Sequence, residues 1–169
     1  MLVYHKNKLR HIAVIPLGGK NITMDISTLN IDDMEVAEKM KCKYGSAYTE
    51  PQERDKTLEY SIDMDHKVSS VKFQQVVEAR MQEIIENVWT QVPPEYQDKL
   101  NGGIILTGGG ANLKNVELAF RKRTKIEKVT TVLFVPDTVN TTGKNNAVPH
   151  DGTMNTLLGL MMKGDINCD

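Results

Sequence analysis

A triple glycine between a strand-like run and a helical pattern constrains the fold of this chain most. Residues 102–107 (GGIILT) are apolar and β-type, and the run ends at Gly108, Gly109 and Gly110, directly before a helical pattern. Glycine allows positive φ and close approach of the backbone to a ligand, and a helix start presents unbonded N–H groups. Any α/β protein can use such a turn. The stretch therefore predicts a mixed α/β fold and suits a nucleotide, without establishing one.

Composition narrows the class of protein. The chain of 169 residues is long enough for one domain or two small lobes, with 40% apolar and 25% charged residues, as in an ordinary soluble globular protein. A formal net charge of -1 indicates neither a nucleic-acid surface nor an acidic tail. Cys42 and Cys168 have no metal-type or disulfide spacing, which fits a reducing cytosol. The sequence shows no bilayer-spanning apolar run and no signal peptide.

The first half of the chain alternates short strands and helices. Residues 1–4 and 9–16 predict a β-hairpin, and residues 21–29 predict a helix that places its apolar side chains on one face. Asp32 is expected to cap a second helix, with Glu35 as its capping-box partner, Tyr44 as its last residue and Gly45 as its C′ glycine.

Glu38 and Lys41 share a face of this second helix because they are three residues apart. Two interpretations stay open at this point. The pair can be an ordinary intrahelical ion pair, or both side chains can hold the hydroxyls of a sugar.

A long amphipathic helix over residues 71–92 is the clearest element of the sequence, because its apolar side chains keep helical spacing over several turns. It follows a half-exposed strand predicted at residues 57–64. Arg80 falls inside the apolar arc of the long helix. Most such arginines lie along the edge of a core with the charged head in water, and the alternative is that this cation faces a partner that carries a carboxylate.

The last third predicts a helix over residues 112–124, a strand over 129–135, a polar loop over 137–149 and a final helix from Met154. The first of these helices ends in Arg121, Lys122 and Arg123. We favour a solvated helix end over a nucleic-acid patch, because no aromatic residues are interleaved for base stacking.

Motifs for catalysis are not found in the sequence. It has no Walker A pattern, no complete dinucleotide fingerprint, no histidines at metal-ligand spacing and no nucleophile elbow. The residues alone thus favour a purine-nucleoside pocket without catalytic or metal-binding residues.

Four segments, in the same order and with compatible spacing, carry a family resemblance. They are residues 15–26 (IPLGGKNITMDI), 37–47 (AEKMKCKYGSA), 78–80 (EAR) and 106–113 (LTGGGANL). They resemble, in turn, the start of the second lobe of the FtsA family of actin-like cell-division proteins, its AExxK helix, a further signature, and the adenosine motif of the actin, Hsp70 and FtsA superfamily. The resemblance covers nearly the whole chain.

The resemblance implies an α/β fold, the second lobe of an actin-like ATPase (ribonuclease H-like), in which a sheet with packed helices carries a smaller inserted α+β subdomain. Residues 1–28 and 100–169 would form the larger, nucleotide-side subdomain and residues 29–99 the insertion. ATP, with Mg in the full-length protein, would lie between two lobes. The implied nucleotide contacts are Gly18 and Gly19 near the phosphates, Glu38 and Lys41 at the ribose, and Gly108, Gly109 and Gly110 around the adenosine.

The resemblance also implies partners. Arg80 matches the family's arginine for the C-terminal tail of the tubulin-like FtsZ, which docks on the smaller subdomain. The family further implies FtsA self-association, no nucleic acid, and a cytoplasmic position at the inner face of the membrane at the division site. It would link FtsZ polymers to the membrane there.

Departures from the family pattern limit these expectations. Neither of the two phosphate-binding hairpins precedes Met1, and Asp151-Gly152 corresponds better to the family's second connecting segment. No amphipathic membrane helix is found before Asp169. We therefore expect a C-terminal lobe without its phosphate side and membrane anchor, and not an enzyme by itself. The alternatives are the second lobe of another actin-like ATPase (PilM-, MreB- or Hsp70-like) or an interaction module with no nucleotide role.

Overall fold

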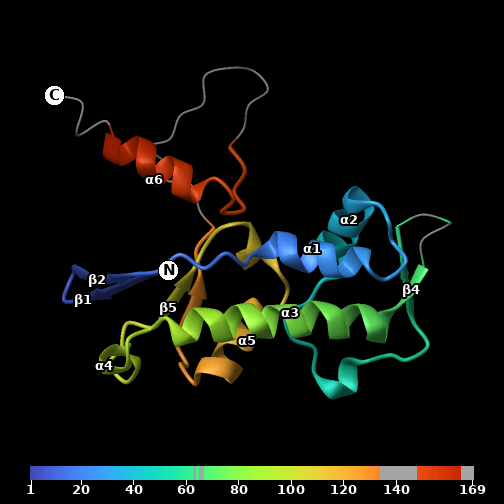
Figure 1. The fold of residues 1–169 in the computed structure, drawn as a ribbon, viewed down its shortest axis with the longest axis horizontal. Helices are drawn as coiled ribbons and strands as arrows, with labels where there is room; N and C mark the ends of the chain where they lie inside the picture. Colours follow the sequence, from blue (N-terminus) through green and yellow to red (C-terminus); the bar gives the residue numbers. More distant parts are fainter. Residues whose placement is uncertain (63, 65–66, 134–147, 165–169) are drawn as a thin grey trace.

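The computed structural model describes residues 1–62, 64, 67–133 and 148–164. Within these residues the structure is mixed α/β with three two-stranded sheets, and the long helix α3 runs along the body of the molecule (Figure 1). The element order is as follows. It runs β1 Leu2–His5, β2 Lys8–Ile12, α1 Gly19–Ser27, α2 Met34–Tyr44, η1 Pro51–Glu53, β3 Glu59–Ser61, β4 Lys67–Ser69, α3 Ser70–Thr90, α4 Pro94–Gln97, β5 Ile104–Leu106, η2 Gly109–Asn112, α5 Val116–Thr124, β6 Val129–Thr131 and α6 Asn155–Gly164.

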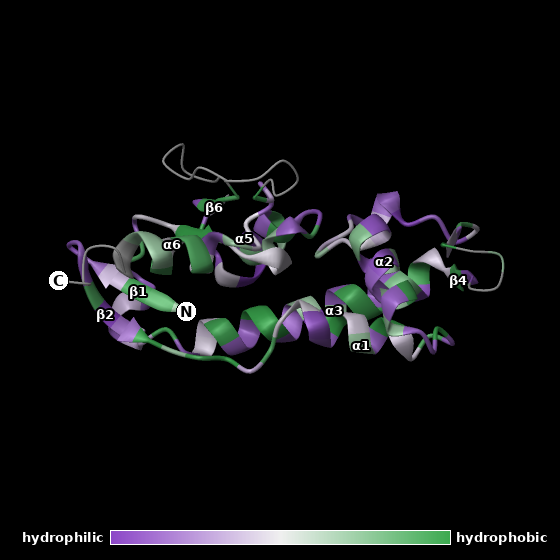
Figure 2. Cartoon of the chain, turned by 90° about the horizontal axis from the view of Figure 1, so that it is seen from above, coloured by the Kyte–Doolittle hydropathy of each residue, from purple (hydrophilic) through white to green (hydrophobic). Residues whose placement is uncertain are grey.

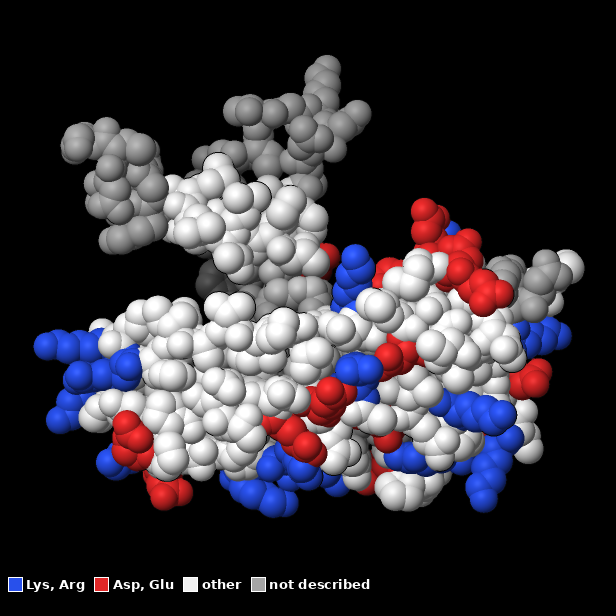
Figure 3. Space-filling model, viewed as in Figure 1, with Lys and Arg blue, Asp and Glu red and all other residues white. Residues whose placement is uncertain are grey.

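The N-terminal hairpin confirms the first sequence prediction, although its second strand ends at Ile12 rather than at residue 16. β1 and β2 are antiparallel and turn through Lys6 and Asn7, which both adopt left-handed φ. Figure 3 shows Lys and Arg side chains gathered at this end of the molecule, and the exposed residues Lys6, Lys8 and Arg10 come from the hairpin.

Helices α1 and α2 follow, and the predicted caps of α2 need correction. Asp33, not Asp32, is the N-cap: its Oδ1 accepts hydrogen bonds from the backbone N–H groups of Glu35 and Val36, at 2.7 and 3.3 Å. Gly45 ends the helix, but with extended backbone (φ -64°, ψ 129°) rather than the left-handed conformation of a C′ glycine. Close packing explains the glycine instead, since a Cβ there would lie 2.4 Å from the Lys41 carbonyl oxygen.

The middle of the chain is dominated by α3, which confirms the predicted long helix. β3 and β4 precede α3 in the chain and form a short antiparallel hairpin. The observed strand, Glu59–Ser61, is therefore shorter than the strand predicted over residues 57–64, of which residue 63 lies outside the described residues. Phe73 of α3 is fully buried and meets the rings of Tyr44 and Tyr60 edge-on. These aromatic contacts join α2, the β3–β4 hairpin and α3.

The glycine stretch forms the predicted strand, turn and helix, with a later helix start. β5 is followed by the 3-10 turn η2, and the α-helix α5 begins at Val116, not at residue 112, after Asn115 in left-handed conformation. β6 pairs with β5 in parallel and ends at Thr131, whereas the strand was predicted to continue; residues 134 and 135 lie outside the described residues. A parallel pair with a helix between its strands is the βαβ arrangement expected of an α/β fold.

One hydrophobic core joins these elements. Helix α1 packs on α2 and on α3, and α5 packs on the other side of α3. Hydrophobic and hydrophilic residues alternate along α3 (Figure 2). The core extends from Ile22 and Ile26 in α1 to Phe120 in α5 and Val129 in β6. It therefore spans both predicted subdomains, and their boundaries at residues 28 and 100 stay a prediction.

Helix α6 stands away from this body (Figure 1). Leu158 is buried, while Leu157, Leu160, Met161 and Met162 are exposed. The side chain of Asn155 connects the start of α6 to the ends of β5 and β6. It donates hydrogen bonds to Thr107 Oγ1 and to the Val132 carbonyl, at 2.9 and 3.1 Å. None of the helices in the described part of the chain is long and apolar enough to cross a membrane.

Candidate functional site

The N-terminus of α1 forms one side of the candidate site. Asn21 fixes this helix start: its Oδ1 accepts from the Gly18 N–H at 2.9 Å, and its own N–H donates to the Gly18 carbonyl at 3.0 Å. The first N–H groups of a helix have no partner within the helix and favour anions. A Cβ at Gly18 would meet nothing within 4 Å, so the space beside this predicted phosphate-side residue is open.

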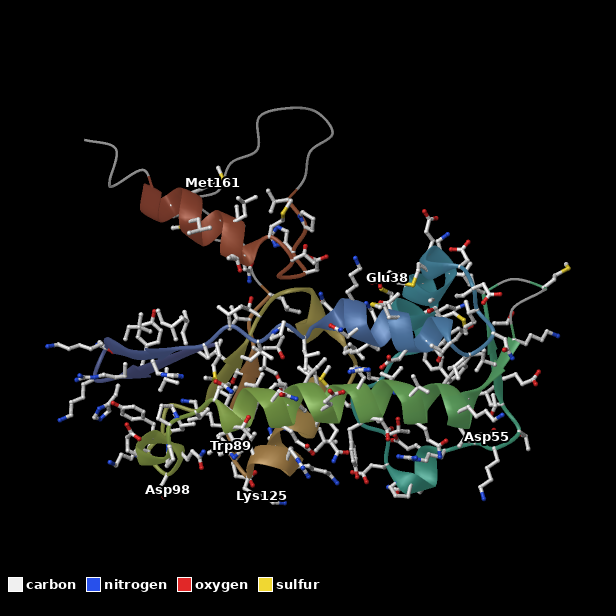
Figure 4. All side chains as sticks on the ribbon, viewed as in Figure 1. Glu38, Asp55, Trp89, Asp98, Lys125 and Met161 are labelled. Carbon is white, nitrogen blue, oxygen red and sulfur yellow. The ribbon has the colours of Figure 1, made fainter. Side chains whose placement is uncertain are left out.

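Glu38 and Lys41 lie on α2 beside the start of α1, and they form the ion pair that the sequence allowed. Lys41 Nζ lies 2.6 Å from Glu38 Oε2. The side chain of Lys41 is 12% exposed and that of Glu38 is 49% exposed, so the carboxylate is the accessible partner (Figure 4). Gly19 touches the same pair, because its carbonyl accepts from Lys41 Nζ at 3.2 Å. The structure thus brings Gly18, Gly19, Glu38 and Lys41 together, and the contact with a sugar stays a prediction.

Thr23 completes this cluster and was missed by the sequence analysis. It is 2% exposed, its Oγ1 bonds to Glu38 Oε2, and it accepts from Lys41 Nζ at 2.9 Å. The sequence contained one signal for it: a hydroxyl between the apolar residues Ile22 and Ile26 needs a hydrogen-bond partner once it is buried. We name Gly19, Thr23, Glu38 and Lys41 the α1–α2 polar cluster.

Electrostatics keep the carboxylate of this cluster charged. Burial raises the pKa of Glu38, but hydrogen bonds from Lys41 and Thr23 and the charge of Lys41 outweigh it, so that the pKa lies below its ordinary value. The pKa of the neighbouring Cys42 thiol is shifted in the opposite direction. Burial, followed by the negative charge of Glu38, raises the pKa of Cys42. Glu38 is therefore an acceptor at neutral pH, and Cys42 is a neutral thiol.

The glycine turn forms a second side of the candidate site. Gly108 has φ +90°, which only glycine adopts readily, and a Cβ at Gly108 or Gly110 would meet nothing within 4 Å. Gly109 instead faces Thr153, whose Cγ2 would lie 3.4 Å from a Cβ at Gly109. The backbone around Gly108 and Gly110 is thus open to close approach by another molecule.

The segment before α6 packs against this turn, which the sequence analysis did not foresee. Gly152 has φ +78°, and its Cβ position lies 3.4 Å from the Gly108 nitrogen. Asn112 Nδ2 donates to the Asp151 carbonyl at 2.8 Å. Asp151 Oδ1 accepts from the N–H and hydroxyl of Thr153, and these hydrogen bonds lower the pKa of Asp151.

A short connection links the α1–α2 polar cluster to the glycine turn. The Ala47 N–H donates to the Lys114 carbonyl at 2.8 Å, and Leu113 Cδ2 would lie 3.3 Å from a Cβ at Gly45. The end of α2 is therefore attached to the residues that follow Gly110. Among the described residues, no hydrogen bond joins Glu38 or Lys41 directly to the three glycines.

Arg80 on α3 has partners within the chain, on α1 and on α3 itself. Its Nε and Nη2 donate to the Asp25 carboxylate at 2.5 and 3.0 Å, and its Nη1 donates to Glu83 Oε2 at 2.6 Å. The hydrogen bond with Asp25 raises the pKa of Arg80 above its ordinary value. The guanidinium is thus partly buried and paired, as for an arginine at the edge of a core, and whether it also binds a partner stays a prediction.

The three cations at the end of α5 are paired as well. Arg121 contacts Glu117 at 2.8 Å, Lys122 contacts Glu50 at 3.1 Å, and Arg123 contacts Glu86. Each is thus balanced by a carboxylate, which fits the solvated helix end favoured from the sequence.

The described residues leave room for part of a nucleotide, and its binding here stays a prediction. Open space beside Gly18, Gly108 and Gly110 and the accessible carboxylate of Glu38 suit an adenosine moiety. In the described ranges, no group of three or more His, Cys, Asp and Glu residues is arranged to hold a metal ion.

Comparison with known sequences gives one family. A family model described as "Cell division protein FtsA" matches residues 1–148. Among curated proteins, the chain is 34% identical over 117 residues to the cell division protein FtsA of Bacillus subtilis (strain 168), covering 68% of the chain and 27% of that protein. It is 32% identical over 141 residues to FtsA of Enterococcus hirae, covering 80% of the chain and 30% of that protein. The chain thus spans under a third of the length of these two relatives.

Solved structures give the fold. The chain is similar to MreB5 of Spiroplasma citri bound to ADP, with a TM-score of 0.57 and 18% identity, covering 92% of the chain and 48% of that protein. MreB5 bound to AMPPNP gives a TM-score of 0.55, also at 18% identity, over 90% of the chain and 46% of that protein. The fold is therefore that of an actin-like lobe, as expected from the sequence, and this likeness shows the fold alone.

Proposed function

Because the chain belongs to the FtsA family of cell division proteins, we propose that it is a scaffold lobe of an FtsA protein, which contributes the adenosine side of an ATP site and docks the tail of FtsZ. The match of the FtsA family model to residues 1–148 is the observation that carries this proposal. The actin-like fold is consistent with it.

The nucleotide part of the proposal is supported by the site geometry. Backbone at Gly108 and Gly110 faces open space, and Gly109 lies between them. The α1–α2 polar cluster presents the accessible carboxylate of Glu38, which lies on α2 beside the start of α1. Adenine and ribose would lie against these two surfaces, and Gly18 and Gly19 would approach the phosphates.

The scaffold part of the proposal is supported by membership of the FtsA family. We propose a scaffold role, and not ATP hydrolysis, for this lobe. In the full-length protein, the lobe would take part in FtsA self-association and in linking FtsZ polymers to the inner face of the cell membrane at the division site. The C-terminal tail of FtsZ would bind near Arg80, where a carboxylate of the tail replaces Asp25 or Glu83 as its partner.

Titration of an FtsZ tail peptide tests the docking. We expect the peptide to bind the chain and Arg80→Glu to weaken binding about tenfold or more, because charge reversal replaces attraction by repulsion. Lys125→Glu is the matched control: it makes the same charge change at the exposed end of α5, on the far side of α3 from α1 (Figure 4). Equal binding to wild type and Arg80→Glu would remove the Arg80 assignment.

Nucleotide titration tests the proposed adenosine contact. We expect weak ATP binding by the chain and weaker binding by Gly109→Val, because its side chain points towards Thr153 and would displace the glycine turn from that residue. The Cβ itself is tolerated, 3.4 Å from Thr153 Cγ2, so a folded variant is expected. ATP binding unchanged in Gly109→Val, in the chain and in a full-length FtsA, would contradict an adenosine contact at the glycine turn.

A further inference from the structure

We propose that Thr23 and Lys41 are positioning residues, which hold Glu38 so that its Oε1 is the acceptor for a ribose hydroxyl of the bound nucleotide. This inference rests on the proposed nucleotide site and sharpens it. The family resemblance gave Glu38 and Lys41 the same role at the sugar, whereas the hydrogen bonds of the structure separate them.

Lys41 has no hydrogen left to donate to a ligand. An ammonium group carries three N–H donors and no acceptor. Lys41 Nζ lies 2.6 Å from Glu38 Oε2, 2.9 Å from Thr23 Oγ1 and 3.2 Å from the Gly19 carbonyl. These three acceptors use all three donors, and the side chain is 12% exposed. A direct contact with the sugar would require Lys41 to give up one of them.

The two carboxylate oxygens of Glu38 accept hydrogen bonds unequally. Its Oε2 receives Lys41 and Thr23, while its Oε1 has only the thiol of Cys42, at 3.6 Å. A thiol is a weak donor, so Oε1 keeps the capacity to accept a stronger hydrogen bond. The Glu38 side chain is 49% exposed, which leaves this oxygen within reach of a ligand. A carboxylate accepts and does not donate, and a sugar hydroxyl is the donor that it fits.

Thr23 joins this carboxylate to the other helix. Its hydroxyl lies on α1, one turn after Gly19, and is 2% exposed. It bonds to Glu38 Oε2 and lies 3.2 Å from the Gly19 carbonyl. One buried hydroxyl therefore fixes the ribose acceptor on α2 relative to the start of α1, where the phosphates would lie. Such pre-organisation strengthens binding without a ligand contact of its own.

A comparison of ATP with 2′,3′-dideoxy-ATP tests the inference, because the analogue lacks both ribose hydroxyls. In the wild-type chain we expect ATP to bind about tenfold or more tightly than the analogue, as for a hydrogen bond to a charged group. Thr23→Val keeps the shape but removes the hydroxyl. It should lower this preference severalfold by weakening ATP binding and leave the affinity for the analogue unchanged. Thr23→Ser should restore the preference.

The variant Lys41→Met separates positioning from contact. The dideoxy analogue lacks the hydroxyls that either role requires, so Lys41→Met is compared in the wild type and in Glu38→Gln. If Lys41 acts only through Glu38, it reduces the preference for ATP in the wild type and changes nothing further in Glu38→Gln. A further loss of ATP binding on adding Lys41→Met to Glu38→Gln would show that Lys41 binds the ligand itself and would overturn its role here. A Thr23→Val chain with an unchanged preference would overturn the role of Thr23.

A second readout needs no ligand. The carboxyl resonance of Glu38 followed by NMR against pH reports its hydrogen bonds, and Thr23→Val should raise the pKa of Glu38 while Thr23→Ser leaves it low. An unchanged pKa in Thr23→Val contradicts the positioning. A low pKa in the wild type together with no binding of either nucleotide would instead contradict the proposed nucleotide site.

Discussion

Arg80 on α3 holds Asp25 on α1 through two parallel hydrogen bonds, from Nε to Oδ2 at 2.5 Å and from Nη2 to Oδ1 at 3.0 Å. Both side chains are about a quarter exposed. This two-point geometry is specific to the arginine–carboxylate pair. Arg80 therefore contributes to the packing of α1 on α3, and a partner carboxylate at this position has to compete with Asp25.

Loss of this pair should destabilise the chain. Asp25→Asn keeps the size of the side chain and removes the charge that faces Arg80. We expect the free energy of unfolding to fall by about 1–2 kcal/mol, between the values for surface and fully buried pairs. Urea unfolding followed by circular dichroism measures it. Glu83→Gln is the matched control, because Glu83 contacts the same guanidinium but is 49% exposed, and its loss should cost less. An equal effect of both changes would contradict a special role for Asp25.

Alanine substitutions in the glycine turn should show which glycine the backbone conformation requires. Gly108→Ala places a Cβ on a residue at φ +90°, which should lower the free energy of unfolding by about 1–2 kcal/mol. Gly110→Ala meets open space without a positive φ and should change stability by no more than about 0.5 kcal/mol. Thermal unfolding of the two variants tests this difference. A Gly108→Ala chain as stable as Gly110→Ala would show that the turn adapts at no cost.

Gly45 should resist substitution although its φ and ψ suit any residue. The Cβ of Gly45→Ala would lie 2.4 Å from the Lys41 carbonyl oxygen and 3.3 Å from Leu113 Cδ2. The end of α2 then has to move, at a cost of about 1–3 kcal/mol in the free energy of unfolding. Gly102→Ala is the control, since a Cβ there meets nothing within 4 Å. Chemical denaturation of both variants gives the comparison, and equal stabilities would contradict the clash.

The sequence was sufficient where one periodic pattern decides the structure. α3 followed from its apolar spacing over several turns, and the β1–β2 hairpin from two apolar runs around a polar turn. The family resemblance supplied the actin-like fold, which the structural neighbours confirm. Local patterns of this kind need no knowledge of distant residues.

Element ends were less predictable, because they depend on tertiary contacts. The sequence offered two adjacent aspartates before α2, and only the path of the backbone selects Asp33 as the cap. α5 starts late because Lys114 and Asn115 are engaged elsewhere: the Lys114 carbonyl accepts from Ala47, and Asn115 Nδ2 donates to the Tyr48 carbonyl at 2.8 Å. Both contacts bridge segments that lie far apart in the sequence.

The candidate site shows the same division. The spacing of Glu38 and Lys41 predicted their ion pair, which the structure confirms. The role of Thr23 was not predicted, because a threonine among apolar residues is typical of a helix face in a core. Its hydrogen-bond partners Glu38 and Lys41 come from another helix. For Arg80 the sequence allowed a core edge or an external carboxylate. The internal carboxylate, Asp25, lies 55 positions away in the chain and could not be identified from spacing.

Low pH should lower the stability of the folded chain through protonation of Glu117. The Thr131 N–H donates to its Oε1 at 2.8 Å and Arg121 contacts its Oε2 at 2.8 Å. The hydrogen bond from Thr131, followed by the charge of Arg121, holds the pKa of Glu117 below its ordinary value of 4.5. A carboxyl with a lowered pKa in the folded state stabilises it fully above the pKa of the unfolded chain. This stabilisation is lost as the pH falls below about 4.5 towards the folded pKa.

Glu117→Gln removes this titration and provides the test. The variant should be less stable than the wild type at pH 7, and the difference should shrink as the pH falls below 4.5, because protonation removes the charge of the wild-type carboxyl. Thermal unfolding at a series of pH values measures it. Glu127→Gln, a change at an exposed carboxylate just before β6, is the control and should follow the wild-type curve. A Glu117→Gln curve that stays parallel to the wild type down to pH 3 would contradict a role for Glu117 in joining α5 to β6.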